Sequence, residues 1–317
     1  MALKSLHEEN LMPRKVMIIL NPMADMGNAW KVADDLRPII NEYGHAAWSG
    51  TVYPTHATEL ARQAGEQGYE MVIAMGGDGT VHEVVNGIML LPENKRPILG
   101  VVPVGSGNDF AHAIGIPMES DHALALALKG EPSTIDLGLM TDQNERREYF
   151  DNTLGIGFDA IVTIRAHKLA IVRGFLMYLT AVIQTIFLNH NPALVQFETD
   201  NEKWEDKMIM TTLCNGGREG GGFKLSPDSK LTDGVLEYIT VRKVSRAMMF
   251  RLIPEFMKGT HGRFTKQIRM GTCKKLTMTA DRPLHIHIDG EIYTSFGSNL
   301  HKLTFEVMPN ALKAVKD

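Results

Sequence analysis

The stretch "VIAMGGDGTVHEVVNGI" at residues 72–88 constrains the fold more than any other part of the chain. An apolar run of strand length is followed by a helical pattern in which Val81, Val84 and Ile88 share one face. Between the two lie three glycines around one aspartate. A strand that enters a helix through so bare a turn is typical of a parallel α/β sheet, whose ligands bind at the carboxyl ends of its strands.

The first half of the chain repeats this alternation of strands and helices. Its apolar runs are not interleaved with polar residues, as expected for parallel strands that are buried on both faces. We therefore expect a doubly wound, parallel-sheet α/β domain over residues 15–137. The predicted strands are 16–20, 48–53, 71–75 and 98–104, and the predicted helices are 29–41, 56–66 and 81–90.

After residue 137 the pattern changes to many short strand-like runs, with hairpin signals such as Asp200-Asn201 and Asp289-Gly290. This pattern predicts a β-rich, sandwich-like domain over 138–300, interrupted by helices at 169–188 and near 245–258. A chain of 317 residues that is 44% hydrophobic is long enough for two such domains, each with its own core.

The apolar stretch 169–188 has about the length of a membrane span. Arg173, Gln184 and Thr185 would be costly in lipid without partners, so we expect a buried or membrane-facing helix and no transmembrane span. Residues 1–14 contain no apolar segment of the kind found in secretory signals. The expected location is therefore the cytoplasm, with peripheral association at a membrane.

Charge and cysteine content exclude two classes of protein. A formal net charge of −4 provides no field that would hold nucleic acid through its phosphates, so no nucleic-acid partner is expected. The two cysteines, Cys214 and Cys273, lie far apart without a CxxC motif. This argues against a disulfide framework or a zinc knuckle and suits a reducing compartment.

The glycine-rich turn from Gly76 to Thr80 predicts a phosphate site, because it leaves backbone N–H groups open at a helix N-terminus. Asp78 would repel a bare phosphate. Its presence fits a divalent cation that bridges it to a nucleotide, or a role in orienting groups through hydrogen bonds. A tight turn with Thr80 as the helix cap is the purely structural alternative.

Two further turns follow neighbouring strands and should line the same crevice. One is "VVPVGSGNDFAHAIG", which carries Ser106, Asn108 and Asp109, and the other is "ILNPMADMGN", which carries Asn21 and Pro22. Asn108 and Asp109 would also serve simply as caps of the helix that follows.

Six motifs occur in a fixed order: "NP" after the first strand, Thr51 five residues before His56-Ala57, "GGDGTVHEVVNG", "PVGSGNDFA", "GGGFKLSPDSKLTDGVLE" and "HIDGE". Together they resemble the diacylglycerol kinase catalytic family of soluble bacterial lipid kinases, which is related to sphingosine and ceramide kinases. GGDGT alone is shared with NAD kinases and phosphofructokinases, whereas the "PVGSGNDFA" and "DGVLE…DGE" elements discriminate. The resemblance runs from about residue 16 to the end.

The resemblance implies ATP-dependent phosphorylation of a lipid hydroxyl, with diacylglycerol as the first candidate. ATP would bind between the domains and the lipid would approach over the β-rich domain from the membrane surface. It also implies that residues 301–317 return to the first domain. The implied nucleotide contacts are Asn21, Pro22, Thr51, Gly76, Gly77, Asp78, Gly79, Thr80, Ser106, Asn108 and Asp109.

By the same resemblance, Glu291 is the general base for the lipid hydroxyl, with Asp289 beside it and Asp78 near the phosphates. Asp289-Gly290 is also a good hairpin turn, and a turn and a base are compatible. Magnesium is expected with ATP. A second, structural magnesium site is implied at the Asp233 carboxylate and the backbone oxygens of Lys230 and Val235, where an ordinary turn is the alternative.

His285, His287 and Asp289 follow at alternate positions and could be taken as a metal triad. We expect instead that both histidines are on the polar side of a half-buried strand whose core face is Leu284, Ile286 and Ile288.

Two residues depart from the family pattern: Asp25 stands where a small residue is usual, and His82 replaces a common asparagine. They keep open a nucleotide- or lipid-binding regulatory protein without turnover. An NAD kinase-like enzyme is a second alternative, since NAD kinases share the GGDGT turn. The sequence leaves the oligomeric state open, with a homodimer as one option.

Overall fold

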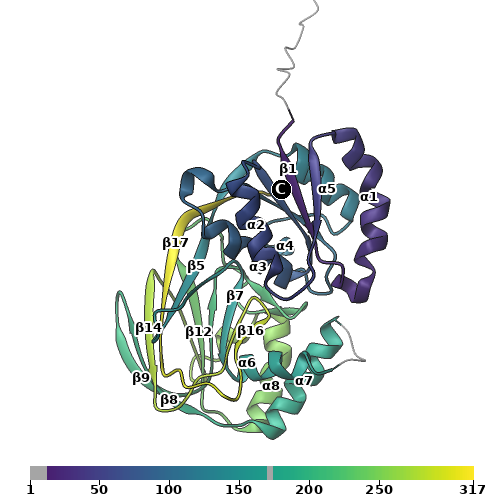
Figure 1. Ribbon diagram of the computed structural model, residues 1–317. Helices are drawn as coiled ribbons and strands as arrows, with labels where there is room; N and C mark the ends of the chain where they lie inside the picture. Colours follow the sequence, from purple (N-terminus) through teal and green to yellow (C-terminus); the bar gives the residue numbers. More distant parts are fainter. Residues whose placement is uncertain (1–12, 170–173) are drawn as a thin grey trace, which may run out of the picture.

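The computed structural model describes residues 13–169 and 174–317. The expectation about a secretory signal falls mainly on residues 1–12, and Arg173 also lies outside the described residues. Figure 1 shows two lobes, one above the other, with the carboxyl terminus in the upper lobe.

The upper lobe contains a parallel sheet, as predicted, and its strand order is β2-β1-β3-β4. Strand β3 is buried throughout, which explains its unbroken apolar run. The strands are β1 (Val16–Leu20), β2 (Ala46–Gly50), β3 (Met71–Gly76) and β4 (Ile98–Pro103). The helices are α1 (Ala29–Tyr43), α2 (His56–Glu66), α3 (Asp78–Met89), α4 (Asp109–Ala113) and α5 (Ser120–Lys129), and η1 (Ala24–Gly27) and η2 (Glu93–Lys95) are short 3₁₀ turns.

The lower lobe is β-rich and largely antiparallel, with its own apolar core. Its strands are β5 (Pro132–Asp142), β6 (Arg147–Phe150), β7 (Thr153–Gly157), β8 (Ala193–Thr199), β9 (Lys203–Cys214), β10 (Arg218–Glu219), β11 (Phe223–Lys224), β12 (Leu236–Arg242), β13 (Ile268–Cys273), β14 (Lys275–Ala280), β15 (Ile286–Ile288), β16 (Glu291–Thr294) and β17 (Lys302–Val315). Its helices are α6 (Phe158–Ala166), α7 (Gly174–Leu188), α8 (Arg246–Lys258) and the 3₁₀ turn η3 (His261–Arg263).

Strand β17 connects the two lobes. It pairs along its length with β5, pairs with β14 in the lower lobe, and reaches β4 of the upper lobe through Ala314 and Leu99. Most of the strands therefore form one continuous sheet. The domain limits 15–137, 138–300 and 301–317 stay a prediction.

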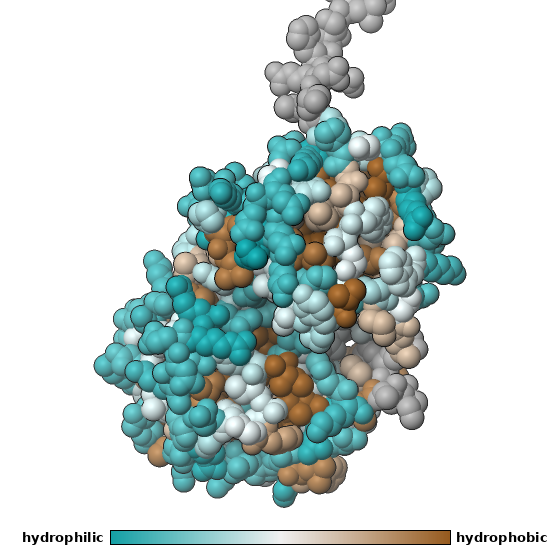
Figure 2. Space-filling view, viewed as in Figure 1, coloured by the Kyte–Doolittle hydropathy of each residue, from teal (hydrophilic) through white to brown (hydrophobic). Residues whose placement is uncertain are grey.

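Helices α6, α7 and α8 cover a second apolar core of the lower lobe. Helix α7 begins at Gly174 in the described part of the stretch expected to be helical. Within residues 13–169 and 174–317, no helix has both the length and the apolar character needed to span a bilayer. Figure 2 shows hydrophilic residues over most of the face in view and an apolar group low on the molecule, where Figure 1 draws α6 and α8 beside β16.

Candidate active site

Loops from both lobes line a cleft of about 780 Å³, which is within the usual size of ligand sites. The upper lobe contributes the three turns that follow β1, β3 and β4. Asn21 Nδ2 donates to Thr80 Oγ1 over 3.1 Å, so the first and second turns are tied together. Any side chain on Gly77 would press on Gly105, and this close approach joins the second and third turns.

The carboxylates of Asp78 and Asp109 converge on one glycine of the third turn. A Cβ placed on Gly107 would lie 2.9 Å from Asp78 Oδ2 and 3.4 Å from Asp109 Oδ2. Asp78 also accepts a hydrogen bond from the Phe110 backbone at 3.1 Å. Burial and the neighbouring Asp109 carboxylate raise the pKa of Asp78 to about 7. Carboxylates beside bare backbone suit a divalent cation, which prefers oxygen ligands. Asp109 is also paired with Arg218 Nε at 2.9 Å and accepts from the Gly221 backbone at 2.9 Å.

The other predicted nucleotide contacts separate into two groups. Thr51 lines the cleft, as do Pro22 and Ser106. Asn108 instead stabilises the third turn. Its Oδ1 accepts from the Gly105 backbone N–H at 2.9 Å, and its Nδ2 donates to the Gly105 carbonyl at 2.8 Å. Gly76 ends β3 behind Thr80, and a Cβ there would collide with the threonine side chain.

Glu291 brings the lower lobe into the cleft. It begins strand β16 directly after a two-residue turn, in which Asp289 and Gly290 both have positive φ, as hairpin turns of this type require. Its exposed carboxylate lies against the Cα of Gly79, so that any side chain on Gly79 would overlap it. The predicted base therefore lies at the N-terminus of α3, beside the glycine-rich turn.

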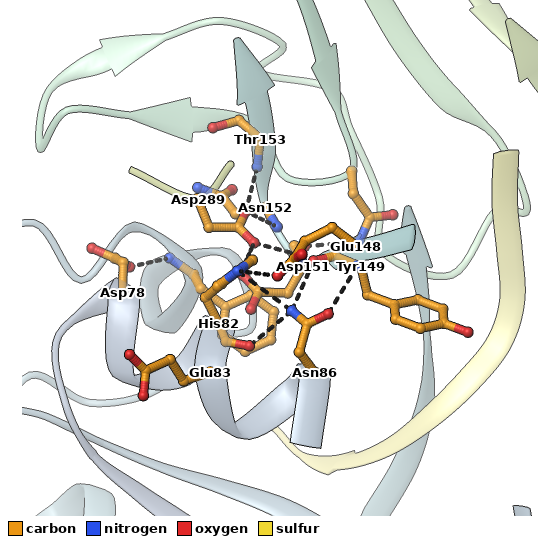
Figure 3. Close-up of polar contacts among 12 residues, drawn as sticks. Asp78, His82, Glu83, Asn86, Glu148, Tyr149, Asp151, Asn152, Thr153 and Asp289 are labelled. Carbon is orange, nitrogen blue, oxygen red and sulfur yellow. Dashed lines mark hydrogen bonds and ion pairs between the residues drawn. The ribbon is translucent and has the colours of Figure 1, made fainter. Parts of the chain in front are cut away.

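Asp289 is almost fully buried and is surrounded by donors (Figure 3). Its carboxylate accepts from the backbone N–H groups of Asp151, Asn152 and Thr153 at 3.0–3.1 Å. His82 Nδ1 of helix α3 lies 2.9 Å from Asp289 Oδ2. With four donors around it, this carboxylate is suited to holding the Asp289–Glu291 turn in place rather than to accepting a proton.

His82 itself lies between several acidic groups at the boundary of the lobes (Figure 3). Its Nε2 is 3.4 Å from Glu148 Oε1. Burial alone would lower the pKa of His82, but hydrogen bonds to Asp289 and Glu148 and the charges nearby raise it to about 10. This shift of the pKa favours the imidazolium form of His82, in which both ring nitrogens are donors.

Several residues of the cleft were not found from the sequence. Glu83 accepts from the backbone of Thr55 and Ala57 at 2.8 and 3.0 Å and so caps helix α2. Tyr178 and Glu219 line the cleft from the lower lobe. No local pattern marks them, because their places depend on contacts between segments distant in the chain.

A second, apolar cavity adjoins the cleft. Tyr178 and Glu219 line both spaces. The rest of the lining is Asp159 and apolar side chains, mainly of α6, α7, α8 and β9. Its volume is about 70 Å³, small against the ~300–1,000 Å³ of typical ligand sites. A long apolar ligand would enter only if α7 and α8 moved apart.

The expectation for His287 was wrong. Strand β15 is paired on both edges, with β7 and β16, and helix α6 packs across it, so His287 is completely buried. It lies beside Asp159 and Glu219. His285 bonds to the Ser295 carbonyl instead, so the His285, His287 and Asp289 side chains do not form a common site.

The loop of the predicted structural magnesium lies apart from the cleft lining. The exposed Asp233 carboxylate accepts from the Val235 backbone at 3.2 Å, and Gly234 donates to Asp136 at 2.7 Å. An ordinary turn also makes such bonds, so this site stays a prediction.

Comparison with known proteins identifies the family. The model for the diacylglycerol kinase catalytic domain matches residues 15–140, and that for the YegS C-terminal NAD kinase beta sandwich-like domain matches residues 152–316. A protein from Chromohalobacter salexigens named probable lipid kinase YegS-like is 33% identical over 80% of this chain and 79% of its own. The chain belongs to the diacylglycerol kinase catalytic family.

Two further proteins are similar to this chain, one in sequence and one in fold. Diacylglycerol kinase of Bacillus subtilis is 29% identical over 88% of this chain and 90% of its own. A crystal structure of a diacylglycerol kinase from Bacillus anthracis is 20% identical and covers 97% of this chain and 98% of its own, with a TM-score of 0.73. The predicted fold class, a parallel-sheet α/β domain followed by a β-rich domain, is confirmed.

Proposed function

We propose that this lipid kinase family member transfers the γ-phosphate of ATP to a hydroxyl group of a lipid, with diacylglycerol as the first candidate. The observation that carries the proposal is the contact of Glu291 with Gly79, which puts a carboxylate of the lower lobe at the glycine-rich turn of the upper lobe. A hydroxyl bound there would meet a proton acceptor and a phosphate site together.

The nucleotide would lie on the three turns of the upper lobe. Backbone N–H groups at the N-terminus of α3 would receive its phosphates, and Asn21, Thr51 and Ser106 would contact the rest. Asp78 and Asp109 would hold a magnesium ion, which when bound neutralises phosphate charge during transfer. Asp289, held by His82 and three backbone donors, would keep Glu291 in position.

The apolar cavity supports a lipid as the acceptor. It meets the cleft at Tyr178 and Glu219, so an acceptor could place its hydroxyl near Glu291 and its chain among the side chains of α7 and α8. A soluble dinucleotide, as in the NAD kinase alternative, would have no use for such a cavity.

A membrane surface is the proposed source of the acceptor. Large apolar side chains are exposed on α7 and α8, close to the apolar cavity: Leu176 is 64% exposed, Leu188 66% and Phe250 37%. Phe187 packs on Phe250 with ring centroids 5.5 Å apart, so the two helices share this surface. These side chains would enter the interfacial region of a bilayer and give peripheral binding in the cytoplasm.

Vesicle cosedimentation tests the membrane contact. Leu176→Asp should weaken binding to vesicles of phosphatidylglycerol and phosphatidylcholine, whereas Leu90→Asp should not, because Leu90 is equally exposed, at 64%, on the upper lobe. Equal binding by both variants would refute this surface.

Transfer of labelled γ-phosphate to a panel of lipids in mixed micelles, with NAD as a soluble competitor, tests the activity. We expect one lipid product that depends on magnesium and that Glu291→Gln reduces by about 10²–10⁴-fold, the usual contribution of a general base. Glu93→Gln, at an exposed position away from the cleft lining, is the control. Phosphorylated NAD would favour the alternative enzyme, and ATP binding without product would favour a regulatory protein.

The second magnesium site, at Asp233 with Lys230 and Val235, is a separate proposal. Magnesium should raise the melting temperature of the native chain, and Asp233→Asn should remove that increase while ATP binding persists.

A further inference from the structure

Three side chains from distant segments meet in the interior of the lower lobe, behind the cleft. Asp159 lies on α6, Glu219 on β10 and His287 on β15, and all three are buried. His287 Nε2 is 3.1 Å from Glu219 Oε1 and 3.5 Å from Asp159 Oδ2. One ligand atom from each residue lies within 4.8 Å of the other two. We call this group the Asp159 cluster.

The imidazole of His287 has no hydrogen-bond partner at either ring nitrogen, although it is completely buried. Its Nε2 is near both carboxylates but is not aligned to donate to either of them. A buried polar atom without a partner is costly, and such an atom calls for an explanation. An ion that accepts the Nε2 lone pair would supply a partner for that nitrogen.

The cluster has supporting hydrogen bonds of the kind that metal sites show, and Tyr178 Oη also donates to Glu219 Oε1 at 2.5 Å. Gly155 borders it, and a Cβ there would overlap both His287 and Asp159. Thr212 Oγ1 donates to Asp159 Oδ2 at 2.9 Å, and Thr153 Oγ1 donates to Glu219 Oε2 at 3.1 Å. Hydrogen bonds of this sort orient carboxylate ligands around metal ions.

We propose that the Asp159 cluster binds a divalent transition-metal ion through one imidazole nitrogen and two carboxylate oxygens, with zinc as the best-suited member of the class. Nitrogen and oxygen ligands lie about 2.0–2.2 Å from zinc in a tetrahedron, which puts neighbouring ligand atoms about 3.4 Å apart. The two distances from His287 Nε2, 3.1 and 3.5 Å, fit that spacing. Magnesium suits the cluster less well, because it prefers oxygen ligands and keeps several waters.

The bound ion would fix the part of the lower lobe that presents Glu291. Strand β15 carries His287 and runs straight into the Asp289–Glu291 turn, while Glu219 and Tyr178 line the cleft. Coordination would therefore join α6, β10 and β15 into one rigid unit behind the cleft. The cluster borders the cavity proposed for the lipid chain, because Asp159 and Glu219 also line it, and it is separate from the magnesium proposed for ATP.

Metal content of the purified full chain tests the proposal. After incubation with zinc and dialysis against metal-free buffer, we expect about one zinc per chain. His287→Asn and Asp159→Asn should each weaken zinc binding by at least about 10-fold, because each removes one ligand. His261→Asn is the matched control, since His261 is also buried in the lower lobe with two unpartnered ring nitrogens but lies outside the cluster.

A second measurement covers the case in which the variants do not fold. Cobalt added to the native chain should give the visible absorption of a four-coordinate site, and zinc should abolish it. Asp233→Asn should keep both signals, which separates the cluster from the proposed magnesium loop. No retained zinc and no cobalt absorption in the native chain would overturn the proposal, as would equal retention by His287→Asn and His261→Asn. Either result would mean that the cluster holds no metal ion and that a protonated His287 lies between the carboxylates of Asp159 and Glu219.

Discussion

His82 on helix α3 contacts Asp289 across the boundary between the lobes, with 2.9 Å between Nδ1 and Oδ2. The histidine belongs to the glycine-rich segment and the aspartate to the turn that presents Glu291. The two halves of the proposed active site are therefore joined by a buried ion pair. An asparagine, which is common in the family at position 82, would be a neutral donor there, whereas a protonated histidine is a charged donor.

Removing the histidine should weaken the protein. His82→Ala leaves Asp289 buried with only its three backbone donors, and breaking a buried pair in this way costs about 3–5 kcal/mol. Urea unfolding would measure the loss. The control is His122→Ala, at an exposed position of α5, which should change stability by less than about 0.5 kcal/mol. Equal losses in the two variants would show that the pair contributes little.

The same pair should make stability depend on pH. The pKa of His82 rises from 6.5 to about 10 on folding, so its stabilisation is complete below pH 6.5 and is lost as the pH rises through about 10. The native chain should therefore lose its advantage over His82→Asn between these limits. Titratable groups other than His82 are present in both chains and cancel in the comparison. Parallel stability curves would contradict the prediction.

Gly79→Ala should displace the proposed base. The new methyl group would overlap the Glu291 carboxylate, and a shift of about 1 Å costs up to about 10²-fold in rate. We expect kcat to fall by about 10- to 100-fold, and Gly79→Ala to have much less effect in a Glu291→Gln background. Gly297→Ala is the control, because a Cβ there meets nothing within 4 Å and φ is not positive. Additive losses in the double variant would refute the contact.

Filling the apolar cavity should affect only the lipid acceptor. Val182→Phe puts a larger side chain into a space of about 70 Å³ between α7 and α8. Turnover of a long-chain acceptor should fall by about 10-fold or more, with the affinity for ATP unchanged. Ile183→Phe, at the next position of α7 and 39% exposed, should leave turnover unaltered. A fall in ATP affinity would show that the substitution disturbs the cleft instead.

Features that depend on local pattern were well predicted. Helix α2 spans 56–66 and strand β1 spans 16–20, as expected, because each is an unbroken periodic run between clear turn signals. In the lower lobe, where no strand bounds were predicted, the segment 147–157 is divided into β6 and β7. The break follows from a contact that no local pattern shows, since the N–H groups of Asp151 and Asn152 bond to Asp289 rather than to a neighbouring strand.

Residues of the candidate active site were likewise predictable only where they belong to a local motif. The glycine-rich turns and Glu291 could be named from motifs, since each is continuous in the sequence. Tyr178, Glu219 and the burial of His287 could not, because they depend on α6, β10 and β15 packing together from segments far apart in the chain. Alternation alone places a strand's polar side in solvent, and it fails when a helix covers that side.

Strand β17 has a consequence for how the chain folds. It follows every other described strand in the sequence, and it pairs with β4 and β5 near the middle of the chain as well as with β14. The sheet of the lower lobe, and its connection to β4, cannot be completed on the ribosome before this strand has emerged. Contacts of such sequence separation slow folding, and until they form the open edges of β4 and β5 are free to pair with other chains. Substitutions in β17 should therefore increase the need for chaperones during synthesis before they lower the stability of the folded protein.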